Sequence, residues 1–492
     1  MAIRLRNKRA EKHLSEFTGG LNDIFNPVLL NDNEASDCQN VIFDEKGTIA
    51  KRKGTVARNT GALTGKIDGL WAYYQRAGST VTPYLLYVRG GTLYKLESDG
   101  TETSLATGLA SGKRMRSTNY LNKTYFLNGT DALRQYDGTS VSLVAGTPPT
   151  GSLIANHKNY MFIAGNTSAP QRIYWSALGD PANWPATNWL DVPFSEGDVI
   201  TAILPFRDAL LICGNSSIWM LLGDANANFA LRKYSDEYGS VNQETALIVQ
   251  NTAFMLSRLG PVAFDGARAI LLGEKIGTAI KSINQAVITE AWAINHNGKY
   301  ICSVPTNMSA TNNLELVYDY LRTAWTKFAG RNLSAYTAYA PAGIDLPYAG
   351  DVSNGRIYEL DQGYNDNGAA IDAYWDSKTF DFGFPEAKKK FISMYVFVKS
   401  ESAAAVLDVY ADNDYSGYEL VKSLNLQGSS TDWDSADWDL ASWDGSSLAA
   451  SQRADFSSRA KHTRIRVRNN GVNQPFSLYR ISLLMKIKPP RK

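Results

Sequence analysis

The chain has 492 residues, which is too long for one ordinary hydrophobic core, so two or three domains are expected. Charged residues make up 20% of it, and 39 glycines accompany 26 tyrosines and 11 tryptophans, a composition typical of a β-rich protein with many tight turns. The formal net charge of +2 excludes a bulk electrostatic attraction to nucleic acid or to an anionic membrane.

The three cysteines, Cys38, Cys213 and Cys302, are odd in number and far apart, so a disulfide scaffold is not expected. Apolar runs stay shorter than the roughly 18 residues that a membrane span needs. We therefore expect no membrane span, and a protein made and kept in the cytosol or built into something assembled there.

The segment from residue 17 to residue 54 is the most informative part of the chain. It combines a double glycine, a stretch rich in acids and amides, one short strand and a basic exit. None of this is typical of catalysis, so we interpret residues 1–60 as an extended assembly arm. The residues that define the motif are Gly19, Gly20, Asn33, Glu34, Asp37, Asn40, Gly47, Arg52 and Gly54.

Residues 61–370 repeat one pattern of short apolar strands separated by polar turns. The second strand of each unit, such as 84–88, 124–127 and 160–163, recurs at steps of roughly 36 to 50 residues, the period of four-stranded propeller blades. Dipeptides that tolerate a positive φ in tight hairpins support this interpretation. They are Asp99-Gly100, Asn128-Gly129, Asp137-Gly138, Asp265-Gly266, Asn297-Gly298 and Asn354-Gly355. The sequence predicts a β-propeller of six or seven blades.

One helix is expected to interrupt the repeat near 274–291. Ile276, Ile280, Ile283, Val287 and Ile288 follow a helical spacing. This stripe is predicted to pack on the propeller, and the alternative is a helix offered to a neighbouring subunit.

Residues 371–492 show period-two alternation over short strands, which predicts a β-sandwich-like domain. In the stretch 463–468, Arg464 and Arg466 share one face with Arg468, while apolar residues take the other face. We expect a half-buried sheet with a basic outer face. The overall class is all-β.

A loop at 431–445 repeats the dipeptide Trp-Asp at a step of five, which is neither a helical nor a strand period. Packing of the loop on itself, contact with another protein, calcium binding and sugar stacking are the alternative roles of this loop. The candidate partner-contact residues are Trp433, Asp434, Trp438, Asp439, Trp443 and Asp444.

The sequence contains no set of residues typical of an enzyme. The four histidines stand singly, and the nucleophile-elbow, phosphate-loop and C-x-x-C motifs are absent. We therefore assign no catalytic, cofactor-binding or metal-binding residue, expect no cofactor, and predict that the chain is not an enzyme. Two carboxylates from distant blades could still form a glycosidase site, which a polysaccharide depolymerisation assay would detect.

The N-terminal motif, with Gly-Gly, Asn-Glu-x-x-Asp and Arg-x-Gly in that order, resembles the N-terminal segment of phage tail proteins that assemble under the portal. The passages 172–184, 197–201 and 217–223 extend the resemblance over the first two-thirds of the chain. The chain is similar to the tail nozzle, or packaged-DNA stabilisation, proteins of short-tailed bacteriophages (the tail tubular protein B-like family).

This resemblance implies a structural protein of the virion tail, forming a nozzle or hub ring that extends and gates the DNA exit channel and retains the packaged genome. The implied partners are other copies in a homo-oligomeric ring, typically a hexamer, the portal or adaptor, tail fibre or spike proteins, and viral DNA that passes without sequence-specific binding. The alternative function is a receptor- or carbohydrate-binding tail component, favoured by the Trp-Asp loop.

Overall fold

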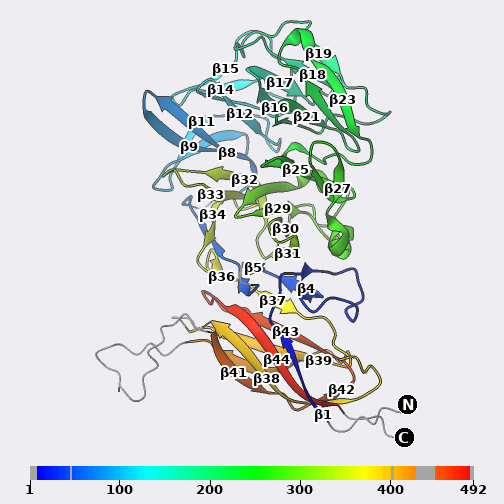
Figure 1. Ribbon diagram of the computed structural model, residues 1–492. Coiled ribbons are helices and arrows are strands. Elements are labelled where there is room, and N and C mark those ends of the chain that lie inside the picture. The colour runs from blue at the N-terminus through cyan, green and yellow to red at the C-terminus, as the bar shows by residue number, and fades with distance from the viewer. Residues whose placement is uncertain (1–7, 45–46, 62, 400–403, 428–448, 488–492) are drawn as a thin grey trace.

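The computed structural model describes residues 8–44, 47–61, 63–399, 404–427 and 449–487 (Figure 1). Strands dominate these residues, and the expected mostly β class is confirmed. Within the described part of the chain, no helix is both long and apolar enough to cross a membrane.

Six four-stranded antiparallel sheets follow one another along the middle of the chain, each with its strands in sequence order. The first three sheets are β8 (Ile67–Ala77), β9 (Thr80–Arg89), β10 (Thr92–Leu96) and β11 (Glu102–Ala106); β12 (Arg116–Tyr120), β13 (Lys123–Leu127), β14 (Arg134–Tyr136) and β15 (Val141–Leu143); and β16 (Leu153–His157), β17 (Tyr160–Ala164), β18 (Arg172–Trp175) and β19 (Trp189–Asp191). The next three are β20 (Ala202–Phe206), β21 (Ala209–Cys213), β22 (Ile218–Leu222) and β23 (Ala230–Ser235); β24 (Leu247–Val249), β25 (Thr252–Ser257), β26 (Gly260–Phe264) and β27 (Ala269–Leu271); and β28 (Trp292–His296), β29 (Lys299–Val304), β30 (Leu314–Asp319) and β31 (Ala324–Ala329).

A further sheet combines both ends of this region. Its strand order is β32 (Leu333–Tyr339), β33 (Leu346–Asp351), β34 (Ile357–Gln362), β7 (Gly54–Ala57), β35 (Asn365–Asp366) and β36 (Ala369–Ala370). The fourth strand, β7, therefore comes from the N-terminal segment and pairs antiparallel with β34. The first strands β8, β12, β16 and β20 contact one another in turn, and β32 contacts β8, so the last sheet of the series lies beside the first.

The tight turns that were predicted between strands are present in the sheets. The glycines of the six predicted turn dipeptides all have positive φ, from +69° at Gly355 to +95° at Gly138. Each strand predicted as the second of a unit, such as 84–88 in β9 and 124–127 in β13, is the second strand of its sheet. A side chain at these turn positions would strain the backbone, so the Asn-Gly and Asp-Gly pairs set the hairpins.

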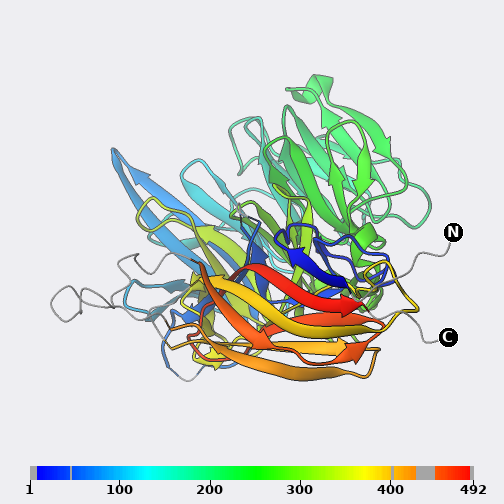
Figure 2. The same cartoon turned by 60° about the horizontal axis from the view of Figure 1, so that its bottom comes forward.

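Two larger sheets contain the C-terminal strands (Figures 1 and 2). One has seven strands, β5 (Val41–Phe43), β6 (Ile49–Lys51), β44 (Ser477–Ile487), β38 (Lys389–Lys399) and β41 (Ala449–Asp455), with β1 (Lys8–Leu14) on β44 and β42 (Arg459–Ala460) on β38. The other has five, β4 (Asp37–Gln39), β37 (Ala373–Asp376), β43 (Thr463–Asn469), β39 (Val406–Asn413) and β40 (Tyr418–Asn425). Val396 and Leu483 from the first sheet join Val409 and Val467 from the second in one buried cluster.

The outer face of β43 is not a free basic surface, contrary to the expectation. Arg464 pairs with Asp412 at 3.0 Å. Arg466 and Arg468 likewise lie 2.6 and 2.7 Å from aspartates on or beside β37. Asp412 lies directly opposite Arg464 in the register of the sheet, so the charges cancel strand by strand.

The expected helix near 274–291 is replaced by short turns: η3 (Gly273–Ile276), α1 (Gly277–Lys281) and η4 (Ile288–Glu290). The side-chain oxygen of Asn284 accepts a hydrogen bond from the Ala286 N–H, which turns the chain away from a continuous helix. Ile276, Ile283 and Ile288 are nevertheless buried against the molecule. Two further 3₁₀ turns, η1 (Asn226–Asn228) and η2 (Gln243–Thr245), lie between sheets.

Candidate assembly site

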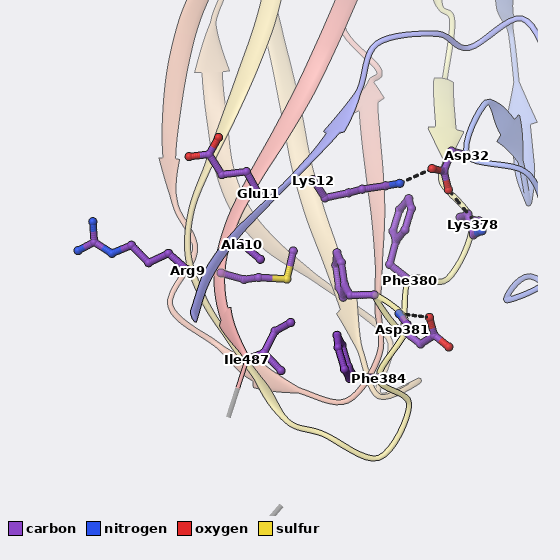
Figure 3. Close-up of a pocket in the computed structure, with 13 residues that line it drawn as sticks. Arg9, Ala10, Glu11, Lys12, Asp32, Lys378, Phe380, Asp381, Phe384 and Ile487 are labelled. Carbon is purple, nitrogen blue, oxygen red and sulfur yellow. Dashed lines mark hydrogen bonds and ion pairs between the residues drawn. The ribbon is translucent and has the colours of Figure 1, made fainter. Parts of the chain in front are cut away.

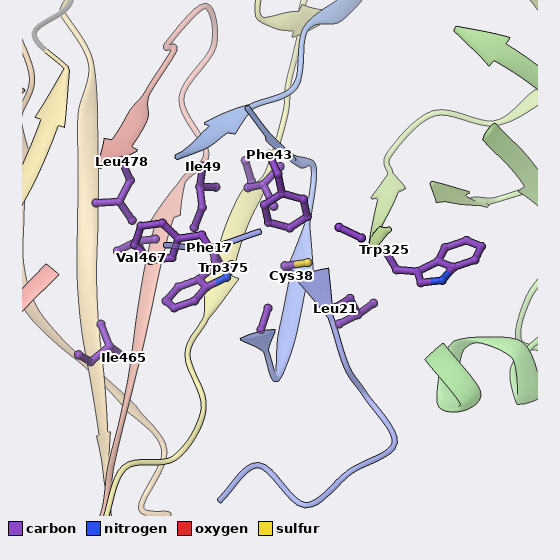
Figure 4. Close-up of a cluster of buried hydrophobic side chains, with 14 of the residues drawn as sticks. Phe17, Leu21, Cys38, Phe43, Ile49, Trp325, Trp375, Ile465, Val467 and Leu478 are labelled. Carbon is purple, nitrogen blue, oxygen red and sulfur yellow. The ribbon is translucent and has the colours of Figure 1, made fainter. Parts of the chain in front are cut away.

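The N-terminal segment lies between the series of sheets and the two C-terminal sheets (Figure 1). In Figure 4, Cys38 lies between Trp375 and Val467 on one side and Trp325 on the other, and Phe17 lies beside Trp375. The Phe17 side chain is fully buried, and its ring meets that of Trp375 edge-on at 5.1 Å between centroids. The described residues 8–44 and 47–57 thus contribute seven strands, β1 to β7, and pair within their own chain. The expectation of an extended arm is corrected here for these residues, because their apolar side chains fill the junction.

The double glycine allows a close approach of backbones. Gly20 has φ +73°, and a Cβ atom there would lie 2.7 Å from the backbone nitrogen of Trp325. A Cβ atom on Gly19 would lie 2.7 Å from the carbonyl oxygen of Asn33, which accepts the Gly19 N–H at 3.0 Å. Beyond this point β2 (Gly20–Leu21) pairs in parallel with β3 (Glu34–Ala35). Larger residues would separate this segment from β31.

Glu34 is buried and holds the segment to the short helical turns. Its carboxylate accepts hydrogen bonds from the Asn31 N–H at 2.9 Å and the Asn22 amide at 3.2 Å, and the Lys275 Nζ lies 2.9 Å away. Burial opposes ionisation, but the Lys275 ammonium and these donors together hold the pKa of Glu34 below its ordinary value. Nearby, the Asp23 carboxylate accepts hydrogen bonds from the first N–H groups of α1, so the segment also caps that helix.

Arg52 is the most connected motif residue. Its guanidinium donates to both carboxylate oxygens of Asp366, at 2.9 and 2.6 Å, and to the carbonyl oxygen of Ala329 at 3.2 Å. Its Nε donates to the side-chain oxygen of Asn40 at 2.8 Å. Only 2% of the Arg52 side chain and 9% of the Asp366 side chain are exposed. This buried, two-pronged ion pair ties the N-terminal segment to the sheet of β32–β36.

Asn40 and Asp37 complete the anchoring. Asn40 has φ +56°, and its amide donates to the carbonyl oxygen of Asp372 at 2.8 Å. The Asp37 carboxylate pairs with Lys327 Nζ at 2.7 Å and accepts the Tyr374 hydroxyl at 3.0 Å. Both residues therefore bridge β31 to the C-terminal strands.

The last two glycines of the motif are required by the backbone conformation and by close backbone contacts. Gly47 has φ +76°, and its carbonyl oxygen accepts the Phe17 N–H at 3.1 Å. At Gly54 a Cβ atom would lie 1.8 Å from the carbonyl oxygen of Asn365, so only glycine fits where β7 enters its sheet. Each motif residue described above thus makes contacts within its own chain.

Several partners of the motif could not be found from the sequence. Lys275, Asp366 and Lys327 stand at isolated positions far along the chain, without a local pattern. From the sequence, Trp375 and Trp325 could be expected only to be buried, because they are large apolar residues. The Trp-Asp loop with Trp433, Asp434, Trp438, Asp439, Trp443 and Asp444 lies outside the described residues.

An ion-pair cluster joins sheets that are not neighbours in the series. Arg114 and Arg116, at the start of the second sheet, both pair with Glu244, which lies between the fourth and fifth sheets. Arg114 Nη1 and Arg116 Nη2 each donate to Glu244 Oε2 at 2.9 Å. Arg114 also lies 3.6 Å from Glu290, which pairs with Lys66, the residue just before the first sheet. Burial opposes ionisation, but the two guanidinium groups lower the pKa of Glu244 to about 2.

A mostly β chain that repeats four-stranded antiparallel sheets along its middle belongs to the class of β-propeller proteins. A family model described as phage stabilisation, "Bacteriophage P22 Gp10, beta-propeller", matches residues 39–280. This match confirms the resemblance to the tail nozzle, or packaged-DNA stabilisation, family that was inferred from the sequence. The chain is a structural protein of a bacteriophage tail.

Comparison with other proteins adds distant likenesses. No curated protein matches the chain. The computationally designed protein Ika8 is 10% identical, with a TM-score of 0.38, covering 63% of this chain and 99% of that one. Two structures of the extracellular domain of BT4673 from B. thetaiotaomicron are 8% and 9% identical, with TM-scores of 0.43 and 0.45, covering 78% and 81% of this chain. The chain spans 57% and 58% of the length of those two structures.

Proposed function

We propose that identical copies of this chain, six by analogy with the family, form a nozzle or hub ring below the portal and adaptor. The ring extends and gates the DNA exit channel and retains the packaged genome. The single observation that carries this proposal is the family match over residues 39–280. The proposed neighbours are the portal or adaptor and the tail fibre or spike proteins, and no catalytic activity is part of the role.

We propose further that the sheets of residues 61–370 are seven blades of one closed propeller. The contact of β32 with β8 supports closure, because it brings the last sheet against the first. Strand β7 supports it too, since one sheet then contains strands from both ends of the region. The two sheets that share the C-terminal cluster would form a β-sandwich-like domain over residues 371–492, completed by strands from residues 1–60.

The ion-pair cluster bears on the path of the DNA. Arg116 and Glu244 connect the second sheet with the boundary of the fourth and fifth, so in a propeller of seven blades they would meet across its centre. A centre occupied by buried ion pairs leaves no passage for a duplex. The DNA path of this proposal therefore runs between the copies of the ring and not through any one of them. The near-neutral charge of +2 is compatible with DNA that slides past without strong phosphate contacts.

A phage that lacks this gene tests the genome-retaining role. Particles grown without the protein should package DNA and then lose it, so negative-stain images should show empty heads. Particles complemented with the wild-type gene should show filled heads. Intact, DNA-filled heads in the absence of the protein would contradict the proposal.

A further inference from the structure

The first strand of the chain, β1, lies at an edge of the seven-stranded sheet. It pairs antiparallel with β44 along its whole length, from Lys8 opposite Ile487 to Leu14 opposite Ile481. On its other side, no described residue pairs with it in a ladder. Because β1 is the first described element, it can leave its place without breaking any other strand.

Only Leu14 among the described side chains of β1 is fully buried. Leu14 is buried, but Glu11 and His13 expose 62% and 44% of their side chains. Lys12 pairs with Asp32, whose side chain is half exposed, and such surface pairs add little stability. His13 Nδ1 also lies 2.9 Å from the Ser482 hydroxyl and 2.7 Å from Arg480 Nη2, so β1 is attached by these contacts and by its backbone ladder with β44.

The hinge between β1 and the rest of the segment is short and well defined. Ser15 and Glu16 are exposed, whereas Phe17 is fully buried against Trp375. Movement of β1 would thus stop at Phe17 and leave the junction described above intact. Seven residues of strand span roughly 23 Å, so the swinging strand can reach a neighbour that lies directly beside the sheet.

Two cavities lie beside β1, and Figure 3 shows the larger one. A cavity of about 700 Å³ lies between β1 and the loop that carries Phe380, Phe382 and Phe384. A second, of about 210 Å³, opens on the outer face of the sheet beside Glu11 and His13. The backbone of Phe382 has φ +54°, a strained conformation at the wall of the larger cavity. A strand flanked by cavities gains little from packing where it lies.

We propose that in the assembled ring β1 of each copy pairs with β44 of the next copy. The occupant of the β44 edge would then be the same strand of a second copy, in the same register, so the complementarity of the two surfaces is already present in one chain. Such an exchange of strands needs no contacts other than those that β1 and β44 already make within one chain. When each copy gives its β1 to the next copy, the contacts can close into a ring. The proposal rests on the ring of the proposed function and names the element that links its members.

A pair of cysteines reports which chain supplies the strand. Glu11 lies opposite Leu484, and both line the smaller cavity on the outer face. Phage particles carrying only the double variant E11C/L484C would be treated with a short bifunctional maleimide, and the protein separated on a denaturing gel. The three native cysteines are fully buried and should not react.

Exchange predicts a ladder of covalently linked copies up to the size of the ring. The matched control is Y395C/S482C, which joins β38 to β44 beside the same cavity. Both of its strands are internal, so it should give only links within one chain. As a second measurement, deletion of residues 1–14 should abolish the ring while the remaining chain stays folded.

Links within single chains only, in particles whose ring is visible by electron microscopy, would overturn the exchange and leave the proposed function standing. The absence of any link between positions 11 and 484 would overturn it too. Particles without any ring would refute the proposed function, and the exchange with it.

Discussion

The replacement of Glu244 by glutamine tests the ion-pair cluster most sharply. The variant E244Q keeps the size of the side chain but removes the charge that both Arg114 and Arg116 face. Only 6% of the Glu244 side chain is exposed, so its charge is held by these partners and not by solvent. The pKa falls from an ordinary value of 4.5 to about 2 in the folded chain. A shift of this size corresponds to about 3 kcal/mol of stability at pH 7.

The sign of the pH dependence follows from the direction of the shift. A carboxyl group whose pKa is lowered by folding contributes stability that is complete above its unfolded pKa, and this contribution is lost as the pH falls through the folded pKa. The difference between the wild type and E244Q should therefore be about 3 kcal/mol at pH 7 and should shrink by about 1 kcal/mol on going to pH 3.5. Urea unfolding followed by tryptophan fluorescence at both pH values gives the two free energies of unfolding.

The matched control is E196Q, since Glu196 is an exposed glutamate of the same region. Its substitution should change the free energy of unfolding by less than about 0.5 kcal/mol at either pH. A loss for E244Q that is equally small at pH 7, or one that does not change between pH 7 and pH 3.5, would refute the reasoning.

Three further outcomes are expected. R52K should cost about 3 kcal/mol in the free energy of unfolding, because lysine cannot reproduce the buried two-pronged contact with Asp366, whereas R172K at the exposed pair with Asp191 should cost less than about 1 kcal/mol. G54A should lower the midpoint of urea unfolding, since its Cβ atom would overlap Asn365, at a cost of at least about 2 kcal/mol; an unchanged midpoint would show that β7 does not enter the sheet as described. Particles with Trp433, Trp438 and Trp443 replaced by alanine should adsorb to host cells as the wild type does, and a loss of adsorption would favour the receptor-binding alternative.

The repeated sheets could be predicted from the sequence because their signals are local. An Asp-Gly or Asn-Gly pair between two apolar runs, as at Asp137-Gly138, is sufficient to place a hairpin, and the glycine has φ +95° in the structure. The helix that was predicted near 274–291 is not continuous, because its interruption depends on contacts that the local spacing does not show. Ile276, Ile283 and Ile288 share a helical spacing and are buried, but the turn at Asn284 breaks the helix. This turn includes a hydrogen bond from the Asn284 N–H to the carbonyl oxygen of Pro305, which lies far along the chain.

The role of the N-terminal motif could not be predicted from the sequence. Arg52 and its partner Asp366 lie 314 positions apart, and Asp37 and Tyr374 lie 337 apart, so no window of the chain contains both members of either pair. A run of glycines, acids and amides is equally typical of a free arm and of a segment buried between sheets. The packing of Phe17 against Trp375 and the buried pair of Arg52 with Asp366 distinguish the two.

A cryo-electron microscopy map of the tail in DNA-filled particles tests the central claim most directly. We expect a ring of copies below the portal, each with a solid series of sheets, with the DNA density in the space that the copies enclose. A map with the duplex running through the centre of a single copy, or with one isolated copy on the tail, would contradict this account.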